Sequence, residues 1–139
     1  MKAIRDPEVR LRQLILRHAR IATRARGAIA FLSDEARALP PAQRTKVESR
    51  MRVYIDLLRD TLDELKKDGR LRDVDATVAA FSIAGMILWM PRWFRQGGRL
   101  TPEEVAEEIA NLALGGVLRA ATATPSTAPV ARRARARAS

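Results

Sequence analysis

The chain has 139 residues, the length of a single domain, and it contains no cysteine, which excludes a disulfide framework, a thiolate metal site and a cysteine nucleophile. Its net charge is +10, but half of that charge comes from the five arginines of residues 119–139, so the rest of the chain is less basic than the total suggests. The N-terminus lacks the apolar region and cleavage site of a secretory signal, and we expect a cytoplasmic protein.

Two helices are predicted before residue 40. Asp6 and Pro7 form a helix start, because aspartate caps free backbone N–H groups and proline fits the first turn. The apolar side of this first helix repeats at helical spacing and consists of Leu11, Leu14, Ile15, His18 and Ala22. A second, shorter helix is expected to end near Leu39, before Pro40-Pro41, and its apolar positions are Ile29, Leu32 and Ala36.

The third predicted helix has the clearest pattern in the chain. Its apolar stripe keeps the 3.6-residue period over more than five turns and consists of Val47, Met51, Tyr54, Ile55, Leu58, Leu62 and Leu65. Gly69 is expected to end this helix, because glycine readily adopts the left-handed conformation that closes a last turn. Leu71 can then fold back onto that turn.

The fourth predicted helix is uncharged from Ala76 to Pro91 and follows an Asp75 cap. It is too short for a bilayer span, which needs about 20 apolar residues. A helix that is apolar on all sides must be buried on all sides. In a domain of this size, we expect one face to lie on the domain itself and the other to lie on a second copy of the chain.

The fifth predicted helix begins with a capping box formed by Thr101, Pro102 and Glu104. Its apolar stripe consists of Val105, Ile109, Leu112, Ala113 and Gly116. Beyond Leu118 no periodicity remains, so we expect residues 1–118 to form the domain and residues 119–139 to form a disordered tail. No stretch alternates as a strand would, and the predicted fold class is all-α, an antiparallel helical domain.

The sequence shows no catalytic motif. It has no Gly-rich phosphate loop, no HExxH motif and no nucleophile elbow, and the single histidine cannot build a metal site with a second histidine or a cysteine. The four glutamates at 103, 104, 107 and 108 suit the positive end of a helix dipole. We therefore expect no enzyme activity, no catalytic residues, no metal and no cofactor.

An apolar ligand cavity is the alternative to ordinary core packing for several side chains. His18 shares the register of Leu14, so it is either a core histidine or a polar contact to a ligand. The cluster around Trp89 and Trp93 is either core and dimer packing or the lining of a cavity. The candidate ligand-binding residues are His18, Met51, Tyr54, Leu58, Met86 and Trp89.

The ordered series of motifs resembles a known family. The run Gly69-Arg70-Leu71-Arg72, Asp75, Ala79-Ala80 and Gly85-Met86 resembles the G-x-(L/F)-R…D…A-A…G pattern of TetR/AcrR-type regulators. Downstream, a subgroup pattern, W…W-(Y/F)-R-x-x-G…L-(S/T)-x-E-E…G, resembles Trp89, Trp93-Phe94-Arg95, Gly98, Leu100-Thr101, Glu103-Glu104 and Leu114-Gly115-Gly116. Several members of that subgroup sense fatty-acyl or steroid-derived CoA thioesters. The resemblance covers about residues 6–118.

This resemblance implies a C-terminal effector-binding and dimerisation domain whose last two long helices form a four-helix bundle with a twin subunit. The expected dimer-interface residues are Ala80, Ile83, Ala84, Ile87, Ile109, Ala113 and Gly116. The chain starts where the helix-turn-helix head of such a regulator would end, so we expect the DNA-reading part to be missing. Binding of DNA should then be weak and nonspecific, and no membrane is expected as a partner.

Three functions remain open at this point. The first is a ligand-sensing, dimerising module in transcription control, which responds to an apolar or acyl-CoA-like effector. The second is a small helical dimer that carries an acyl ligand without regulating transcription. The third is a nonspecific nucleic-acid binder that acts through the arginines of residues 119–137.

Overall fold

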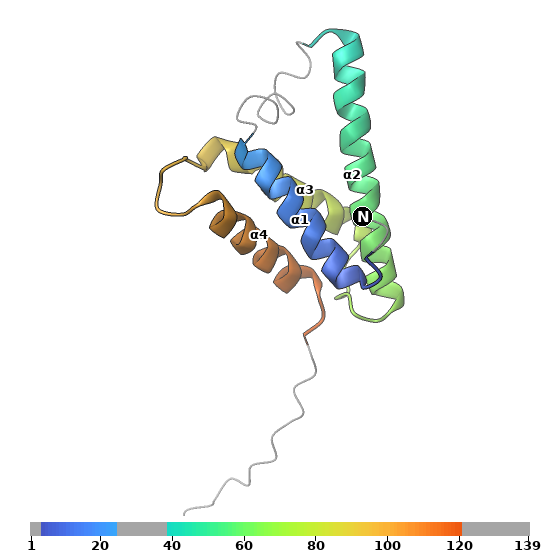
Figure 1. Cartoon of the computed structure of the whole chain (residues 1–139). Coiled ribbons are helices and arrows are strands. Elements are labelled where there is room, and N and C mark those ends of the chain that lie inside the picture. Colours follow the sequence, from blue (N-terminus) through green and yellow to red (C-terminus); the bar gives the residue numbers. More distant parts are fainter. Residues whose placement is uncertain (1–3, 25–38, 121–139) are drawn as a thin grey trace, which may run out of the picture.

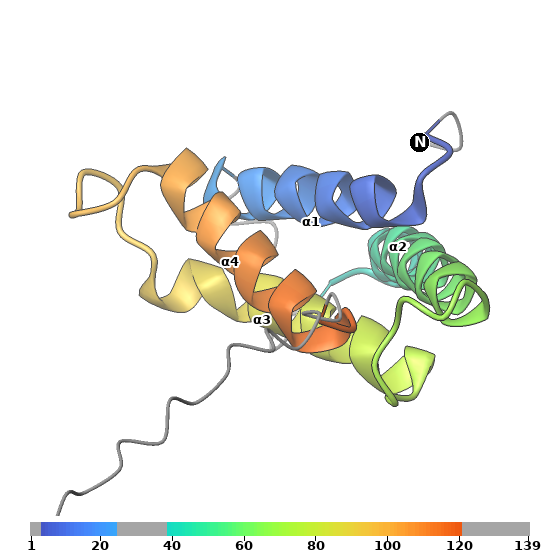
Figure 2. The same ribbon diagram turned by 90° about the horizontal axis from the view of Figure 1, so that it is seen from below.

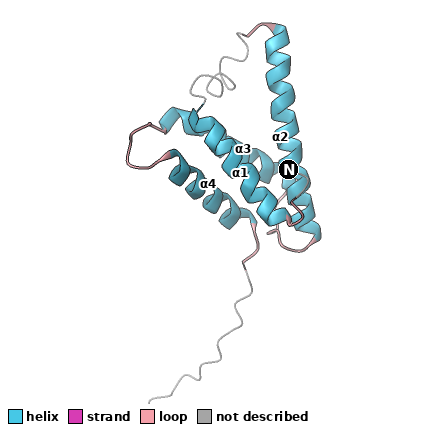
Figure 3. Ribbon diagram, in the orientation of Figure 1, coloured by secondary structure: helices cyan, strands magenta, loops and turns pink. Residues whose placement is uncertain are grey.

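A computed structural model describes residues 4–24 and 39–120, and it folds them into four helices (Figure 3). They are α1 (Pro7–Arg24), α2 (Pro41–Lys67), α3 (Ala76–Trp93) and α4 (Pro102–Val117). The all-α prediction is confirmed, since the described part of the chain contains no strand beyond one isolated β-bridge. The predicted second helix through Ile29, Leu32 and Ala36 lies outside the described residues, as do residues 121–139 of the predicted tail.

Helices α1 and α3 organise the packing, because each of them contacts the other three helices. Figure 2 shows α1 along one side of the molecule and α3 along the opposite side. Helix α2 packs with its C-terminal half, while its N-terminal half rises beyond the other helices (Figure 1). The outward faces of α1 and α3 therefore point in opposite directions.

The core is built from the inward stripes of all four helices. The largest fully buried side chains are Leu11, Leu14, Ile15, Thr23, Leu58, Thr61, Leu62, Leu65, Ile83 and Met90. Small residues of α3, among them Ala80 and Ala84, are also fully or almost fully buried, and they let the neighbouring helices approach closely. Burial of such apolar surface is the main source of stability, at about 25 cal/mol per Å².

Local signals fix three of the helix starts as predicted. The Asp6 carboxylate accepts from the Glu8 N–H at 2.8 Å, and the Asp75 carboxylate accepts from the Val78 N–H at 2.9 Å. Thr101 and Glu104 form the full capping box, in which each side chain accepts from the other's backbone N–H. These bonds satisfy N–H groups that the first turn of a helix leaves free.

Helix α2 ends as predicted and begins earlier than its apolar stripe. Gly69 has a φ of +69°, the left-handed conformation that glycine allows, and the N–H of Arg70 then bonds to the Leu65 carbonyl at 2.9 Å. The helix starts at Pro41, six residues before the stripe begins. Pro41 thus supplies the first residue of α2, where the missing N–H of proline costs no hydrogen bond.

Helix α3 continues through Pro91 and ends at Trp93. Proline lacks an N–H and cannot extend the hydrogen-bond pattern at its own position, but the chain stays helical for two further residues. Helix α3 therefore extends two residues beyond the uncharged stretch that ends at Pro91. No helix in the described ranges is long and apolar enough to cross a membrane.

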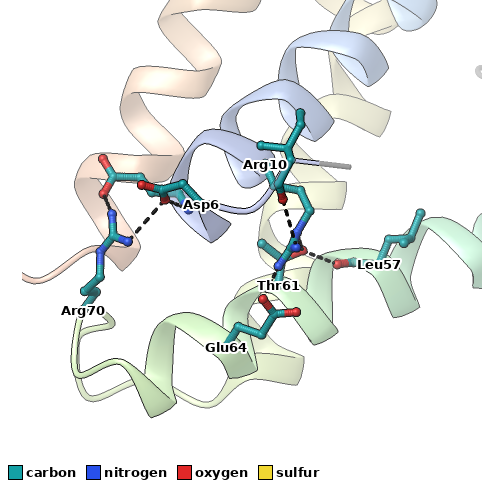
Figure 4. A network of polar contacts seen from close by, with 8 residues as sticks. Asp6, Arg10, Leu57, Thr61, Glu64 and Arg70 are labelled. Carbon is teal, nitrogen blue, oxygen red and sulfur yellow. Dashed lines mark hydrogen bonds and ion pairs between the residues drawn. The ribbon is translucent and has the colours of Figure 1, made fainter. Parts of the chain in front are cut away.

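A polar network joins the start of α1 to the end of α2 (Figure 4). The Arg10 guanidinium donates to the Thr61 hydroxyl at 3.2 Å and pairs with Glu64, while the Thr61 hydroxyl donates to the Leu57 carbonyl at 2.7 Å. Arg70, just after α2, pairs with Asp6 at 3.2 Å. The network holds the two helices in a fixed relative position next to the core.

A short main-chain clasp joins the α2–α3 loop to the residues after α4. Leu71 and Leu118 form an antiparallel β-bridge. The N–H of Arg72 donates to the Val117 carbonyl at 2.8 Å, and the N–H of Arg119 donates to the Arg70 carbonyl at 2.8 Å. The clasp fixes the C-terminal end of α4 against the loop that precedes α3.

Candidate functional site

The only histidine and the only tyrosine of the chain stack on each other between α1 and α2. The ring centroids of His18 and Tyr54 lie 3.4 Å apart, and the ring planes meet at 21°. The inward register of α1 supplies His18, and the apolar stripe of α2 supplies Tyr54. Two of the predicted ligand-binding residues are therefore brought into direct contact.

His18 is neutral at neutral pH. Burial is the main cause that lowers its pKa below 6.5, and the nearby charge of Arg17 lowers the pKa further, while the bond to Leu14 opposes both. Its Nδ1 lies 3.2 Å from the Leu14 carbonyl oxygen. Because a carbonyl oxygen only accepts, Nδ1 carries the proton and Nε2 keeps its lone pair.

The Tyr54 hydroxyl is buried without a partner. The side chain is 4% exposed, and no group in the described ranges lies within hydrogen-bond distance of the hydroxyl oxygen. Burial raises the pKa of Tyr54 far above its usual value. A buried polar group left unpaired costs about 1–3 kcal/mol, and an acceptor supplied from outside would remove that cost.

Two further predicted residues lie on the same helix beside Tyr54. Leu58 is fully buried one turn later, and Met51 is half-buried one turn earlier. Met51 also lines an open groove of about 520 Å³ between α2 and α3. The apolar lining of the groove is Val47, Met51, Ile55, Phe81 and Leu88, and its charged residues are Glu48, Arg52, Asp56 and Arg59.

Met86 and Trp89 do not belong to this site. They lie on the outward side of α3, where Met86 is 36% exposed and Trp89 is 58% exposed, with the Arg92 guanidinium 4.4 Å from the Trp89 ring centroid. Each residue turns a helix by about 100°, so Trp89 points away from the core that its neighbours Ile87 and Met90 enter. The structure thus does not bring the six candidates together: four lie at the α1–α2 pair, and Met86 and Trp89 lie on the outward side of α3.

The expected dimer-interface residues occupy mainly the inner side of α3 and α4. Six of them lie in the core of their own chain, where they leave almost no surface for a partner: Ala80, Ile83, Ala84, Ile87, Ile109 and Ala113. Only Gly116 is exposed. The apolar residues that face outward are instead Val78, Phe81, Trp89 and Trp93 of α3 and Leu112 of α4.

The physical reason for this shift is the composition of α3. A helix that is almost wholly apolar carries only a weak mark of which side faces inward: its few polar residues, Thr77, Ser82 and Arg92, all lie on the exposed side. The small residues were interpreted as the partner side, but they lie where the chain's own helices cross. The signal that could have separated the sides is size, because Phe81, Trp89 and Trp93 share one side and the alanines share the other.

The arrangement offers binding groups rather than reactive ones. It presents one hydroxyl donor, one imidazole acceptor and a neighbouring apolar groove. In the described ranges, no three histidine, cysteine or acidic side chains are grouped closely enough to hold a metal ion.

Comparison with known proteins identifies the family. A model of the tetracycline repressor-like C-terminal domain matches residues 5–117. No curated protein sequence matches the chain.

Several solved structures resemble this fold. A TetR/AcrR-family regulator from Thermobifida fusca is 31% identical, with a TM-score of 0.72 over 81% of this chain and 60% of that one. AibR, crystallised with isovaleryl coenzyme A and operator DNA, is 33% identical, with a TM-score of 0.67 over 80% of this chain and 60% of that one. PfmR from Thermus thermophilus is 29% identical, with a TM-score of 0.71 over 81% of this chain and 62% of that one.

The chain thus spans about 60% of the length of these regulators. The match to the family model covers α1 to α4 in full. The chain belongs to the TetR/AcrR family of transcriptional regulators, as a tetracycline repressor-like C-terminal domain.

Proposed function

We propose that this domain senses an apolar or acyl-CoA-like effector and forms a homodimer in the control of transcription. The observation that carries the proposal is the Tyr54 hydroxyl, which is buried with no partner among the described residues. The ring of Tyr54 stacks on His18, and an apolar groove lined by Met51 lies along the same helix. Ligand sites in proteins combine a mostly apolar lining with a few polar groups that orient the ligand. The α1–α2 pair and the groove together supply both.

The relatives support the choice of ligand class. AibR, at 33% identity, was crystallised with isovaleryl coenzyme A, an acyl thioester. The Met51 side chain lines the groove and precedes Tyr54 by one turn, so an acyl chain in the groove would lie close to the hydroxyl. The exposed Arg52 at the groove can face the phosphates of a coenzyme A group.

Dimerisation is proposed through the outward faces of α3 and α4. These faces expose Val78, Phe81, Trp89, Trp93 and Leu112, a set of large apolar side chains that water solvates poorly. A two-fold axis would place the same face of both copies in contact. A stable dimer of this kind would bury at least the standard area of about 1,600 Å² in total.

Contacts of this chain with DNA are proposed to be weak and independent of sequence. The apolar stripes of the four described helices are used by the core, and base reading needs a helix delivered to a groove. The arginines on the outward side of α1 can meet phosphates, which carry no sequence information. Such binding should weaken steeply as salt rises.

Thermal-shift measurements with acyl-CoAs of increasing chain length test the sensing function. A ligand at 100 times its Kd should stabilise the domain by about 2.7 kcal/mol. Free coenzyme A serves as the control for binding of the nucleotide part alone. If no chain length shifts the melting temperature, the proposed sensing of acyl ligands fails.

A further inference from the structure

We propose that Tyr54 selects effectors that carry an uncharged carbonyl group, by donating its hydroxyl proton to that oxygen, and that the site rejects the corresponding free carboxylate. This inference rests on the proposed function, since it names the chemical group that the effector must present. It assigns Tyr54 a specificity role that ordinary core packing would not give it.

Among the polar side chains between α1 and α2, Tyr54 differs in its hydrogen bonding. The neighbouring polar groups already have partners: Thr61 donates to the Leu57 carbonyl and accepts from Arg10, and His18 Nδ1 donates to the Leu14 carbonyl. The Tyr54 hydroxyl has none among the described residues, although its side chain is almost completely buried. The fold thus holds a donor in place with no acceptor of its own.

Charge around the hydroxyl also favours a neutral ligand group. Among the described residues, burial is the cause that raises the pKa of Tyr54. The imidazole stacked on it is neutral at neutral pH. The terminal nitrogens of Arg10 and Arg59 pair with Glu64 and Asp56, while the Arg59 Nε is buried with no partner among the described residues. A carboxylate placed at the hydroxyl would lose its hydration and meet only cations that a carboxylate already pairs, which is more costly than burying a neutral carbonyl.

A ligand in the groove can approach Tyr54 along α2. Met51 lines the groove and lies one turn before Tyr54, on the same side of the helix. Its unbranched thioether side chain adopts new rotamers at small cost. Tyr54 does not itself line the groove, so an acyl chain reaches the hydroxyl only when the Met51 side chain moves aside.

The experiment compares two pairs of ligands, each of which differs only at the carbonyl group. The first pair is the acyl-CoA whose chain length stabilises the wild type most and the S-alkyl-CoA of the same length; the second pair is the fatty-acid methyl ester and the free fatty acid of that length. Kd is measured by calorimetry for the wild-type chain and for Tyr54→Phe. Ser49→Ala is the matched control, because it removes a hydroxyl of the same helix that bonds to the Thr45 carbonyl at the exposed surface.

The wild type should prefer the thioester over the thioether by about tenfold, the value of one good hydrogen bond. Tyr54→Phe should lose that preference, and Ser49→Ala should keep it. The free acid should bind more weakly than its methyl ester to both. The unliganded Tyr54→Phe protein should melt at the same temperature as the wild type or higher, because it no longer buries an unpaired hydroxyl.

The contrary outcomes are distinct. Equal affinity for thioester and thioether in the wild type, or tighter binding of the free acid, overturns the inference and leaves the sensing function intact. A marked fall in the melting temperature of unliganded Tyr54→Phe also overturns it, since the hydroxyl would then have a partner within the fold. Absence of binding by every acyl-CoA refutes the sensing function itself, and with it this inference.

Discussion

The outward faces of α1 and α3 lie on opposite sides of the molecule and differ sharply in chemistry (Figure 2). The face of α1 carries Arg17, Arg20 and Arg24, which form no ion pair within the described ranges, and residues 9–24 contain no acid. The face of α3 exposes Phe81 and Trp89 and other apolar side chains, with Arg92 as its only charged residue. Both helices bury their other side in the same core.

The two helices differ in whether their exposed side needs a partner. Helix α1 is an ordinary amphipathic helix, whose charged side is solvated by water and needs no partner. Helix α3 has no such side, so the fold leaves large apolar groups exposed until something covers them. The following predictions test that distinction, beginning with the largest effect.

Substitution on the inner side of α3 should destroy the fold. Ala84 is almost fully buried, so Ala84→Arg places an unpaired charge in the core and should destabilise the domain by about 3–5 kcal/mol. Circular dichroism during thermal unfolding measures the loss. If Ala84→Arg yields a well-folded monomer, Ala84 faces a partner and the assignment of the inner side is wrong.

Substitution on the outer side should change assembly and leave the fold intact. Val78 on α3 is 59% exposed and Val9 on α1 is 49% exposed, so the same change at both makes a matched pair. Val78→Glu should convert a dimer into a folded monomer at micromolar concentration, because the charge would be desolvated at the interface. Val9→Glu should sediment as the wild type does. Equal behaviour of the two variants in analytical ultracentrifugation would contradict a dimer through α3.

Stability should depend on pH through His18, which belongs to the inner side of α1. Its pKa is lowered by burial, so the unfolded chain binds more protons once the pH falls below about 6.5. The free energy of unfolding should therefore be constant above that value and fall as the pH drops through it. As the only histidine, His18 gives a single imidazole signal that can be titrated by NMR. His18→Gln should remove this part of the pH dependence; an unchanged profile would show that other groups cause it.

The smallest effects should come from the arginines of α1. Arg10 points inward to Thr61 and Glu64, with a side chain only 12% exposed, and Arg10→Gln should cost about 1 kcal/mol. Arg20 points outward, and Arg20→Gln should change stability by less than about 0.5 kcal/mol. Urea unfolding measures both. A cost at Arg20 equal to that at Arg10 would mean that the outward face of α1 has a partner too.

The fold was predictable wherever a local chemical signal marks it. Asp6, Asp75 and Thr101 cap helices as expected, and Gly69 ends α2, because each acts within a few residues of its own position. Orientation was less predictable. The period of α2 shows which side is buried, whereas α3 offers only Thr77, Ser82 and Arg92 to mark its outer side.

The candidate site was predictable in part for the same reason. His18 and Tyr54 each lie on a clear inward stripe, and the fold brings them into a stack. Met86 and Trp89 lie on the helix whose orientation the pattern leaves undetermined, and they face outward. Contacts between helices, such as the groove between α2 and α3, depend on crossing geometry that no short stretch of sequence encodes.

The clasp between the α2–α3 loop and the end of α4 has a consequence for sequence variation. It is held by main-chain atoms, from the N–H of Arg72 to the Val117 carbonyl and from the N–H of Arg119 to the Arg70 carbonyl. Nineteen of the twenty amino acids supply the same N–H, and proline alone does not. In a library of variants, the two main-chain bonds of the clasp should therefore exclude only proline at positions 72 and 119. A junction that fixes the path of the chain can thus be almost invisible in the amino-acid sequence.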